Sequence, residues 1–310
     1  MKVIVAGSSG LVGSALVNTF TSQGHQVVGI NRSVVDLLNA ASTKKFIQQE
    51  APELIIDAAA KVGGIGANNS YPVEFLNDNL TIQGNLMQAA HGAGVPKFVF
   101  LGSSCIYPRD CAQPIKEEYL MTGPLESTNS AYAIAKIAGI ELINSYRKEF
   151  GTKWISLMPT NLYGPRDNFD LKASHVLPAL IRRFVEATES GAPTVTLWGT
   201  GSPLREFLHV DDLAQAVVIA ASKYDDSLHL NVGTGEDLTI KELAGKVAAT
   251  AGYSGEIQWD ASKPDGTPRK VLDVSRIKAL GWEPTITLDA GIAATINWYK
   301  DASANGEVRK

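Results

Sequence analysis

Tyr132 and Lys136 stand four residues apart in the run Ala131-Tyr-Ala-Ile-Ala-Lys136. On a helix, two residues at this spacing lie on the same face, about one turn apart. An ammonium group near a phenol stabilises the phenolate, so we expect Lys136 to lower the pKa of Tyr132 from its usual value of about 10. Tyr132 would then donate and accept protons at neutral pH. Such pairs are common on helices, so the reaction has to be identified from the rest of the chain.

Three small polar side chains follow an apolar run upstream of this pair. Residues Phe98–Leu101 have the pattern of a buried strand, and Ser103, Ser104 and Cys105 come soon after it. In open α/β sheets the site lies outside the carboxyl ends of the strands. We therefore expect Ser103 to reach the same substrate as Tyr132, although serine also ends strands for hydrogen-bonding reasons alone.

A glycine-rich turn lies near the beginning of the chain. Residues 2–6 form a short apolar run, and a helical pattern extends from Leu11 to Phe20. Glycines between a strand and a helix allow a tight turn and close backbone approach to a pyrophosphate at the helix N-terminus. The glycine spacing here is three and three, unlike the two and three of G-x-G-x-x-G. The residues expected to hold the pyrophosphate are Gly7, Ser8, Ser9, Gly10, Leu11, Val12 and Gly13.

Strand and helix patterns alternate through the first half of the chain. Strands are expected at residues 27–30, 54–58, 97–101 and 154–158, and helices at 43–50, 79–91 and 131–150. This alternation predicts an α/β fold with a Rossmann-type, doubly wound parallel sheet. Later strands, at 194–198 and 256–259, look isolated and suggest a smaller, interleaved lobe that binds substrate. We expect the Rossmann domain to comprise residues 1–160 and about 202–228, and the substrate lobe about 161–201 and 229–310.

Composition excludes several other classes of protein. The chain has 310 residues, is 45% hydrophobic, and carries 28 basic and 32 acidic residues, which gives a net charge of −4 without a basic block. Nucleic-acid binding is therefore disfavoured. No stretch approaches the roughly 18 apolar residues of a membrane span, and two cysteines do not form a secreted disulfide framework. We expect a cytoplasmic protein.

Taken together, these motifs resemble the extended short-chain dehydrogenase/reductase superfamily and, within it, the GDP-L-fucose synthases. The resemblance covers essentially the whole chain. Segments that carry it include Leu101-Gly-Ser-Ser-Cys-Ile-Tyr-Pro108, Tyr132-Ala-Ile-Ala-Lys-Ile-Ala-Gly139, Met158-Pro-Thr-Asn-Leu-Tyr-Gly-Pro165 and Asp260-Ala-Ser-Lys-Pro-Asp-Gly-Thr-Pro-Arg-Lys270. The resemblance implies epimerisation of GDP-4-keto-6-deoxy-mannose followed by reduction with NADPH.

The cofactor expected from the residues is NADPH. The second strand ends at Asn31-Arg32 without the carboxylate that usually binds the ribose diol of NAD, and Arg32 can pair with a 2′-phosphate. Relatives often carry an arginine within the glycine-rich turn, where Ser8 and Ser9 stand here, so selectivity for NADPH could be weaker. Arg32 could also be a solvated surface residue. The resemblance adds further cofactor contacts at Asp36, Leu37, Leu101, Gly102, Pro159, Asn161, Leu162 and His175.

Reduction of a ketone builds negative charge on the carbonyl oxygen. Tyr132 can donate the proton, Ser103 can hydrogen-bond the same oxygen, and Lys136 can hold the nicotinamide ribose. Epimerisation needs, in addition, a base and an acid on opposite sides of the sugar. The resemblance makes Cys105 the candidate base and His175 the candidate acid, since a thiolate near a cation can have a depressed pKa and histidine titrates near neutrality. Without the resemblance, a buried small cysteine and a structural histidine would be the simpler interpretations.

Further polar and aromatic residues are candidates for binding the substrate. Cationic Arg183, Arg205 and Lys270 can neutralise a diphosphate, Trp198 can stack on a ring, and Asp265 can accept hydrogen bonds from a ribose or base. His209, Asp211 and Asp212 suggest a metal, but their position before an alanine-rich helix favours helix capping. We expect no metal.

Two rival functions remain at this point. A nucleotide-sugar 4-epimerase or 4,6-dehydratase would recycle its nicotinamide, but dehydratases usually show Thr-Asp-Glu where Ser103, Ser104 and Cys105 stand. A module that only senses dinucleotides would tend to lose the tyrosine or the lysine. A 3,6-dideoxy substrate analogue would fit the same residues. The Tyr132 helix carries an apolar stripe formed by Ile134, Ile137, Ala138 and Leu142, which could equally be part of the core. Relatives in the superfamily commonly dimerise through this helix, so the resemblance implies a homodimer.

Overall fold

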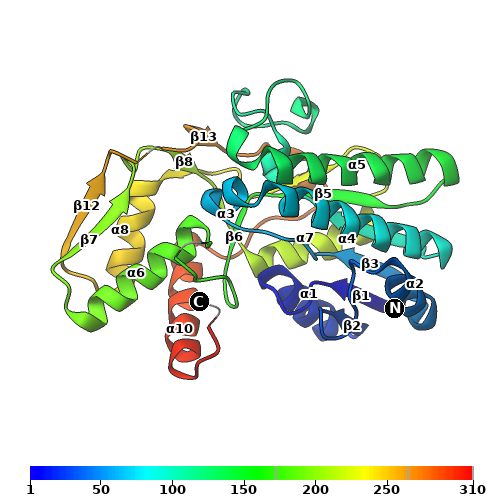
Figure 1. Cartoon of the computed structure of the whole chain (residues 1–310), viewed down its shortest axis with the longest axis horizontal. Coiled ribbons are helices and arrows are strands. Elements are labelled where there is room, and N and C mark those ends of the chain that lie inside the picture. Colours follow the sequence, from blue (N-terminus) through cyan, green and yellow to red (C-terminus); the bar gives the residue numbers. More distant parts are fainter. Residues whose placement is uncertain (172, 264, 309–310) are drawn as a thin grey trace.

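In the computed structural model, an all-parallel sheet of six strands forms the larger part of the molecule (Figure 1). Residues 1–171, 173–263 and 265–308 are described, so residue 264 of the Asp260–Lys270 run and the last two residues of the predicted substrate lobe lie outside the description. The strand order is β10-β5-β4-β3-β1-β2. Their bounds are β1 Lys2–Ala6, β2 Gln26–Ile30, β3 Leu54–Asp57, β4 Lys97–Leu101, β5 Ile155–Pro159 and β10 Leu230–Val232.

Helices cover both faces of this sheet, as the alternating pattern predicts. On one face α4 packs between α2 and α5, and on the other α1 packs against α7. The bounds of these helices are α1 Leu11–Ser22, α2 Ala40–Glu50, α4 Pro72–Gly92, α5 Ser130–Phe150 and α7 Val210–Lys223. The core between the layers is made of aliphatic and aromatic side chains, because central parallel strands are buried on both faces. The expected doubly wound parallel sheet is confirmed.

A second, smaller hydrophobic cluster is formed largely by helices that lie on the left of Figure 1. Its helices are α6 Val176–Ser190, α8 Ile240–Ala251 and α10 Leu288–Ala304. The two strands that looked isolated in the sequence, β7 Thr194–Trp198 and β12 Glu256–Asp260, pair with each other in parallel. Helix α8 begins with a capping box, in which Thr239 and Glu242 satisfy each other's backbone N–H groups.

The predicted boundary between the Rossmann domain and the substrate lobe, at residue 229, is wrong for one strand. Strand β10 pairs with β5 in the main sheet, and helix α9 (Ser275–Ala279) contributes Ile277 to the larger core. A strand of three residues is too short to show a period in the sequence, which explains the misplacement.

Short elements join the two parts of the molecule. They are α3 Ile65–Ser70, β6 Asn161–Tyr163, β8 Leu204–Arg205, β9 Phe207–His209, β11 Leu238–Thr239, β13 Arg269–Lys270 and the 3₁₀ turns Ser104–Ile106, Glu117–Tyr119 and Ser127–Asn129. Strand β6 pairs with β9, and β8 lies between β11 and β13. Among the described residues, none of the helices combines the length and the apolar character that crossing a membrane requires.

Candidate active site

One continuous cavity of about 1850 Å³ runs from the carboxyl ends of the main strands to the second cluster. Its wall includes the glycine-rich turn, the ends of β2, β3, β4 and β5, and residues of β7, β8 and β13. The sequence-predicted site residues converge here from segments far apart in the chain. Those on the wall are Gly7, Ser9, Gly10, Leu11, Val12, Gly13, Arg32, Asp36, Leu37, Leu101, Gly102, Ser103, Cys105, Tyr132, Lys136, Pro159, Asn161, Leu162, His175, Arg183, Trp198, Arg205, Asp265 and Lys270.

The glycine-rich turn fits a dinucleotide. Gly7 has φ +78°, and a Cβ atom added there would lie 2.6 Å from the carbonyl oxygen of Ala58, so the position requires glycine. Gly10 is the N-cap residue of helix α1 and provides no side-chain cap, which leaves backbone N–H groups open to an anion. Ser8 is not on the cavity wall and instead packs against Gly29 of β2.

The end of β2 leaves an exposed cation beside this turn. Arg32 is exposed, and none of the ion pairs between described residues involves it. Asp36 accepts a hydrogen bond from the backbone of Leu38 at 3.0 Å, and Leu37 is buried. The guanidinium is therefore available for a phosphate.

Tyr132 and Lys136 occupy one face of α5, as their spacing predicts. The Lys136 ammonium lies 5.9 Å from the centre of the Tyr132 ring, and it donates a hydrogen bond of 2.9 Å to the carbonyl oxygen of Leu101. The expectation of a lowered tyrosine pKa is wrong for this structure. Burial raises the pKa of Tyr132, as does the negative charge that Cys105 can carry, and a hydrogen bond with Ser103 only partly opposes this rise. At neutral pH Tyr132 is a phenol, which is the species a proton donor must be.

Cys105 and Lys270 meet across the cavity. The Lys270 ammonium donates a hydrogen bond to the Cys105 sulfur at 3.6 Å, and Ser103 accepts a hydrogen bond from the Cys105 backbone at 3.2 Å. His175 stands at the start of α6 and faces the cavity. Its pKa is lowered by desolvation among the surrounding groups and further by the charge of Lys270. His175 is therefore mostly neutral at neutral pH, whereas the sequence predicted titration near neutrality.

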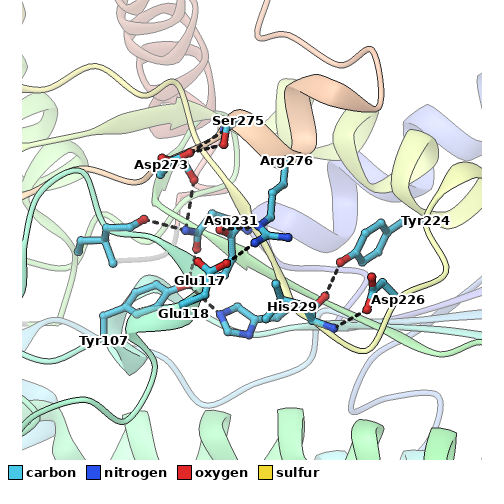
Figure 2. A network of polar contacts seen from close by, with 12 residues as sticks. Tyr107, Glu117, Glu118, Tyr224, Asp226, His229, Asn231, Asp273, Ser275 and Arg276 are labelled. Carbon is cyan, nitrogen blue, oxygen red and sulfur yellow. Dashed lines mark hydrogen bonds and ion pairs between the residues drawn. The ribbon is translucent and has the colours of Figure 1, made fainter.

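A buried polar network, shown in Figure 2, holds the segment after Cys105 in place. Asn231 of β10 is fully buried and donates to the carbonyl oxygens of Ile115 and Asp273, at 2.9 and 3.3 Å. The Tyr107 hydroxyl donates to the Asn231 side chain at 2.5 Å and lies 2.9 Å from the His229 ring nitrogen. Asn231 thus joins the Cys105 loop to the segment that follows Lys270.

Acidic and basic side chains complete this network. The Asn231 backbone donates to Glu117 at 3.1 Å, and Arg276 lies 3.4 Å from the same carboxylate. Burial raises the pKa of Glu117 and lowers the pKa of His229 to about 4. His229 is therefore neutral here, and Tyr107 keeps its proton because burial raises its pKa.

The second cluster contributes the residues predicted to bind the substrate. Trp198 is 70% exposed at the cavity, and Lys263 lies 5.8 Å from the centre of its ring. Asp265 accepts hydrogen bonds from the backbone and hydroxyl of Thr200, at 3.0 and 2.7 Å. Arg205 donates to the carbonyl oxygen of Leu204 at 2.8 Å, and burial lowers its pKa.

A buried carboxylate that joins three segments was not predicted from the sequence. Glu206 is fully buried and accepts hydrogen bonds from the backbones of Gly235 at 2.7 Å and Leu272 at 3.0 Å. Its own carbonyl oxygen accepts from Asn161 at 2.8 Å. No local pattern in the sequence indicates this role, because the hydrogen-bond partners of Glu206 lie in distant segments.

The histidine and two aspartates before α7 act as structural groups. His209 accepts a hydrogen bond from the Asp211 backbone at 3.3 Å and so caps the helix, as expected. Asp212 accepts from the backbones of Thr285 and Ile286, both at 3.0 Å. Among the described residues there is no cluster of three or more histidine, cysteine or acidic side chains that could hold a metal ion.

Comparison with known proteins places this geometry in a family. The model of the NAD dependent epimerase/dehydratase family matches residues 3–233. GDP-L-fucose synthase 1 of Arabidopsis thaliana is 52% identical over 96% of this chain and 93% of its own length. GDP-L-fucose synthase of Escherichia coli strain K12 is 49% identical over 96% of both chains. A solved structure of a GDP-L-fucose synthetase from Naegleria fowleri, bound to NADP, has a TM-score of 0.91 at 28% identity and covers 100% of this chain and 96% of that chain. This chain therefore belongs to the NAD-dependent epimerase/dehydratase family and, within it, to the GDP-L-fucose synthases.

Proposed function

We propose that the protein converts GDP-4-dehydro-6-deoxy-D-mannose to GDP-L-fucose with NADPH. It epimerises the sugar at C3 and C5 and then reduces the ketone at C4. The observation that carries this proposal is that one cavity holds both a reductase set, Ser103, Tyr132 and Lys136, and a second acid–base set, Cys105 and His175. Reduction alone would not require the second set. The identity of about 50% to GDP-L-fucose synthases over nearly the whole chain supports the same substrate.

In the reductase half, Tyr132 supplies the proton. The bound dinucleotide supplies the hydride. As a phenol at neutral pH, Tyr132 donates its proton to the C4 oxygen, and the Ser103 hydroxyl hydrogen-bonds the same oxygen as charge develops on it. Lys136, held on the Leu101 carbonyl, places a positive charge beside the phenolate that forms. It also holds the ribose of the cofactor.

In the epimerase half, Cys105 removes the proton from the carbon beside the ketone. Lys270 hydrogen-bonds its sulfur and stabilises the thiolate that does this work. His175 returns a proton from the other side of the ring. Because its pKa lies below the usual value, an imidazolium formed during turnover would give its proton up readily. The same steps invert both carbons that flank the ketone.

The nucleotide diphosphate is bound by cationic side chains of α6, β8 and β13. Arg183, Arg205 and Lys270 line the cavity and can neutralise the diphosphate. Trp198 is exposed there for stacking, and the Asp265 carboxylate lies close by. In the cofactor half, Arg32 binds the 2′-phosphate, and Asp36 and Leu37 border the adenine. Asn161, Leu162 and Pro159 border the nicotinamide end.

The decisive experiment follows NADPH and the sugar together. With GDP-4-keto-6-deoxy-mannose we expect one NADPH oxidised for each sugar consumed and GDP-L-fucose as the product. Faster turnover of a 3,6-dideoxy analogue would identify the 3,6-dideoxy keto sugars as the substrate class instead. Turnover of an NDP-hexose without added cofactor, combined with no NADPH oxidation, would instead identify a 4-epimerase.

We also propose a homodimer formed through α4 and α5. These helices pack side by side, and apolar side chains on them are exposed, including Ile134 at 49% and Leu80 at 37%. Two copies would cover these side chains. The cytoplasm is the location we propose, because a reducing compartment keeps the Cys105 thiol free for chemistry.

A further inference from the structure

Asp57, the last residue of β3, is a carboxylate buried without an ion-pair partner within 4 Å among the described residues. Its exposed fraction is 0%. One oxygen accepts a hydrogen bond from the Ala59 backbone at 3.1 Å, and the other has no hydrogen-bond partner in the described part of the chain. The next residue, Ala58, lines the cavity, whereas Asp57 does not. Asp57 therefore lies directly behind the cavity wall. A buried polar atom without a hydrogen-bond partner lowers the stability of the fold, so the presence of Asp57 at this position requires an explanation.

The sheet register places Asp57 beside the catalytic helix. Asp57 pairs with Ala6 of β1 and with Phe100 of β4, and register partners point to the same face of a sheet. Helix α5 lies on that face, because a Cβ atom added at Gly139 would collide with the Phe100 ring. The Lys136 ammonium lies over the same ring, 4.7 Å from its centre. Asp57 and Lys136 therefore flank Phe100.

Lys136 is the charged group that acts on Asp57. Ala6 and Phe100, its neighbours on both strands, are uncharged, and no ionisable group of α4 contributes to its titration. Burial raises the pKa of Asp57 to about 6, against the opposing effect of Lys136. Burial lowers the pKa of Lys136, and Asp57 alone opposes that change. Each group thus supports the charged form of the other.

We propose that Asp57 is a positioning residue for the reduction, which keeps the Lys136 ammonium charged beside Tyr132. This inference rests on the roles proposed above for Tyr132 and Lys136. Above pH 6 the Asp57 carboxylate is ionised, so it acts throughout the neutral range. Without it, only desolvation would act on Lys136, which would lose its proton at a lower pH. A neutral residue at position 57 would remove one costly buried charge but leave Lys136 without its counter-charge, and it would narrow the pH range of catalysis.

The test compares pH profiles of kcat for NADPH oxidation between pH 6 and 10. For Asp57→Asn we expect the alkaline limb to move toward acid by at least about one pH unit, with KM for NADPH changed less than about twofold. Asp57→Leu also removes the charge and should behave alike if the asparagine variant folds poorly. Asp57→Glu keeps the negative charge, so the alkaline limb of its pH profile should lie at the wild-type position.

Ser156→Ala is the matched control. Ser156 pairs with Phe100 in the same row of the sheet, is also buried, and has an unpartnered hydroxyl, but carries no charge. The alkaline limb of the pH profile of Ser156→Ala should coincide with that of the wild type. An unmoved limb in both charge-removing variants, or an equal shift in Ser156→Ala, would overturn the proposal. Tyr132→Phe and Lys136→Ala keep the two questions separate: full activity in these variants would refute the roles in reduction themselves, whatever Asp57 does.

Discussion

The ammonium of Lys270 donates a hydrogen bond to the sulfur of Cys105 at 3.6 Å, although the two residues are 165 positions apart in the sequence. Lys270 also lowers the pKa of His175, so a single cation acts on both groups proposed for epimerisation. The Asn231 network brings the two segments together, and Figure 2 shows how it does so. The epimerisation proposed above would therefore depend on a contact that neither segment makes alone.

Lys270→Met should slow epimerisation far more than reduction. The variant keeps most of the side-chain volume and removes the donor that stabilises the Cys105 thiolate. We expect deuterium incorporation from solvent into the keto sugar to fall by about tenfold or more, since a charge-assisted hydrogen bond contributes roughly 1.5–3 kcal/mol. Lys270→Arg is the control that keeps a cation. Equal exchange in both variants would show that the contact has no chemical role.

Cys105→Ser should separate the two halves of the reaction. A hydroxyl is a much weaker acid than a thiol, so proton exchange at the sugar should drop by at least about a hundredfold. Reduction of a ketone that has already been epimerised should continue. Exchange is measured by mass spectrometry in D2O and reduction by NADPH absorbance. Parallel loss of both activities would mean that Cys105 only supports the fold.

Arg32→Ala should weaken the preference for NADPH over NADH. The exposed guanidinium is the cation at the end of β2 that can bind the 2′-phosphate, and Ser8 and Ser9 add no charge in the turn. We expect the ratio of kcat/KM for the two cofactors to fall by about tenfold or more, mostly through KM for NADPH. Arg32→Lys is the matched control for charge. An unchanged ratio in Arg32→Ala would contradict the assignment.

His229 should make the protein lose stability in mild acid. Its pKa is lowered to about 4 by burial in the folded state, against 6.5 as the ordinary value. The unfolded chain therefore takes up the proton first, and the contribution of neutral His229, present above pH 6.5, is lost as the pH falls toward 4. The shift corresponds to about 3 kcal/mol. Urea unfolding of wild type and His229→Gln at pH 4.5 and 7.5 tests this, and the variant should show the smaller pH dependence.

Ile134→Glu should convert the proposed homodimer to a monomer. Ile134 is half exposed on α5, and a charge buried between two copies would cost several kcal/mol. Sedimentation velocity should report one copy for the variant and two for the wild type. Phe150→Glu, at an exposed apolar position at the end of the same helix, serves as a comparison. A wild-type monomer at micromolar concentration would exclude this interface.

The fold followed from patterns that local sequence can express. Strands β1 and β4 match the predicted bounds, and α5 differs from its prediction by one residue, because long apolar periods and glycine turns are local signals. Strand β10 and the pairing of β7 with β12 were missed, because they depend on partners distant in the sequence.

The candidate site, like the fold, was predicted only where the signal is local in the sequence. Residue types and spacing identified Tyr132, the resemblance to the GDP-L-fucose synthases identified Cys105 and His175, and nearly all of the expected residues line one cavity. The direction of the Tyr132 pKa was predicted wrongly, because the effect of Lys136 is visible in the sequence while desolvation is not. The buried polar residues Asp57, Glu206 and Asn231 carried no local signal, since their partners come from other strands and loops.

The single cavity has a consequence for the order of events during turnover. Cys105, His175 and Tyr132 all line this cavity, so under the proposed mechanism the sugar would pass from proton exchange to reduction without leaving the protein. We therefore expect most of the epimerised ketone to be reduced before it dissociates, so that it does not accumulate in solution. In an isotope-trapping experiment, label bound at the start should appear in the alcohol even when excess unlabelled ketone is added.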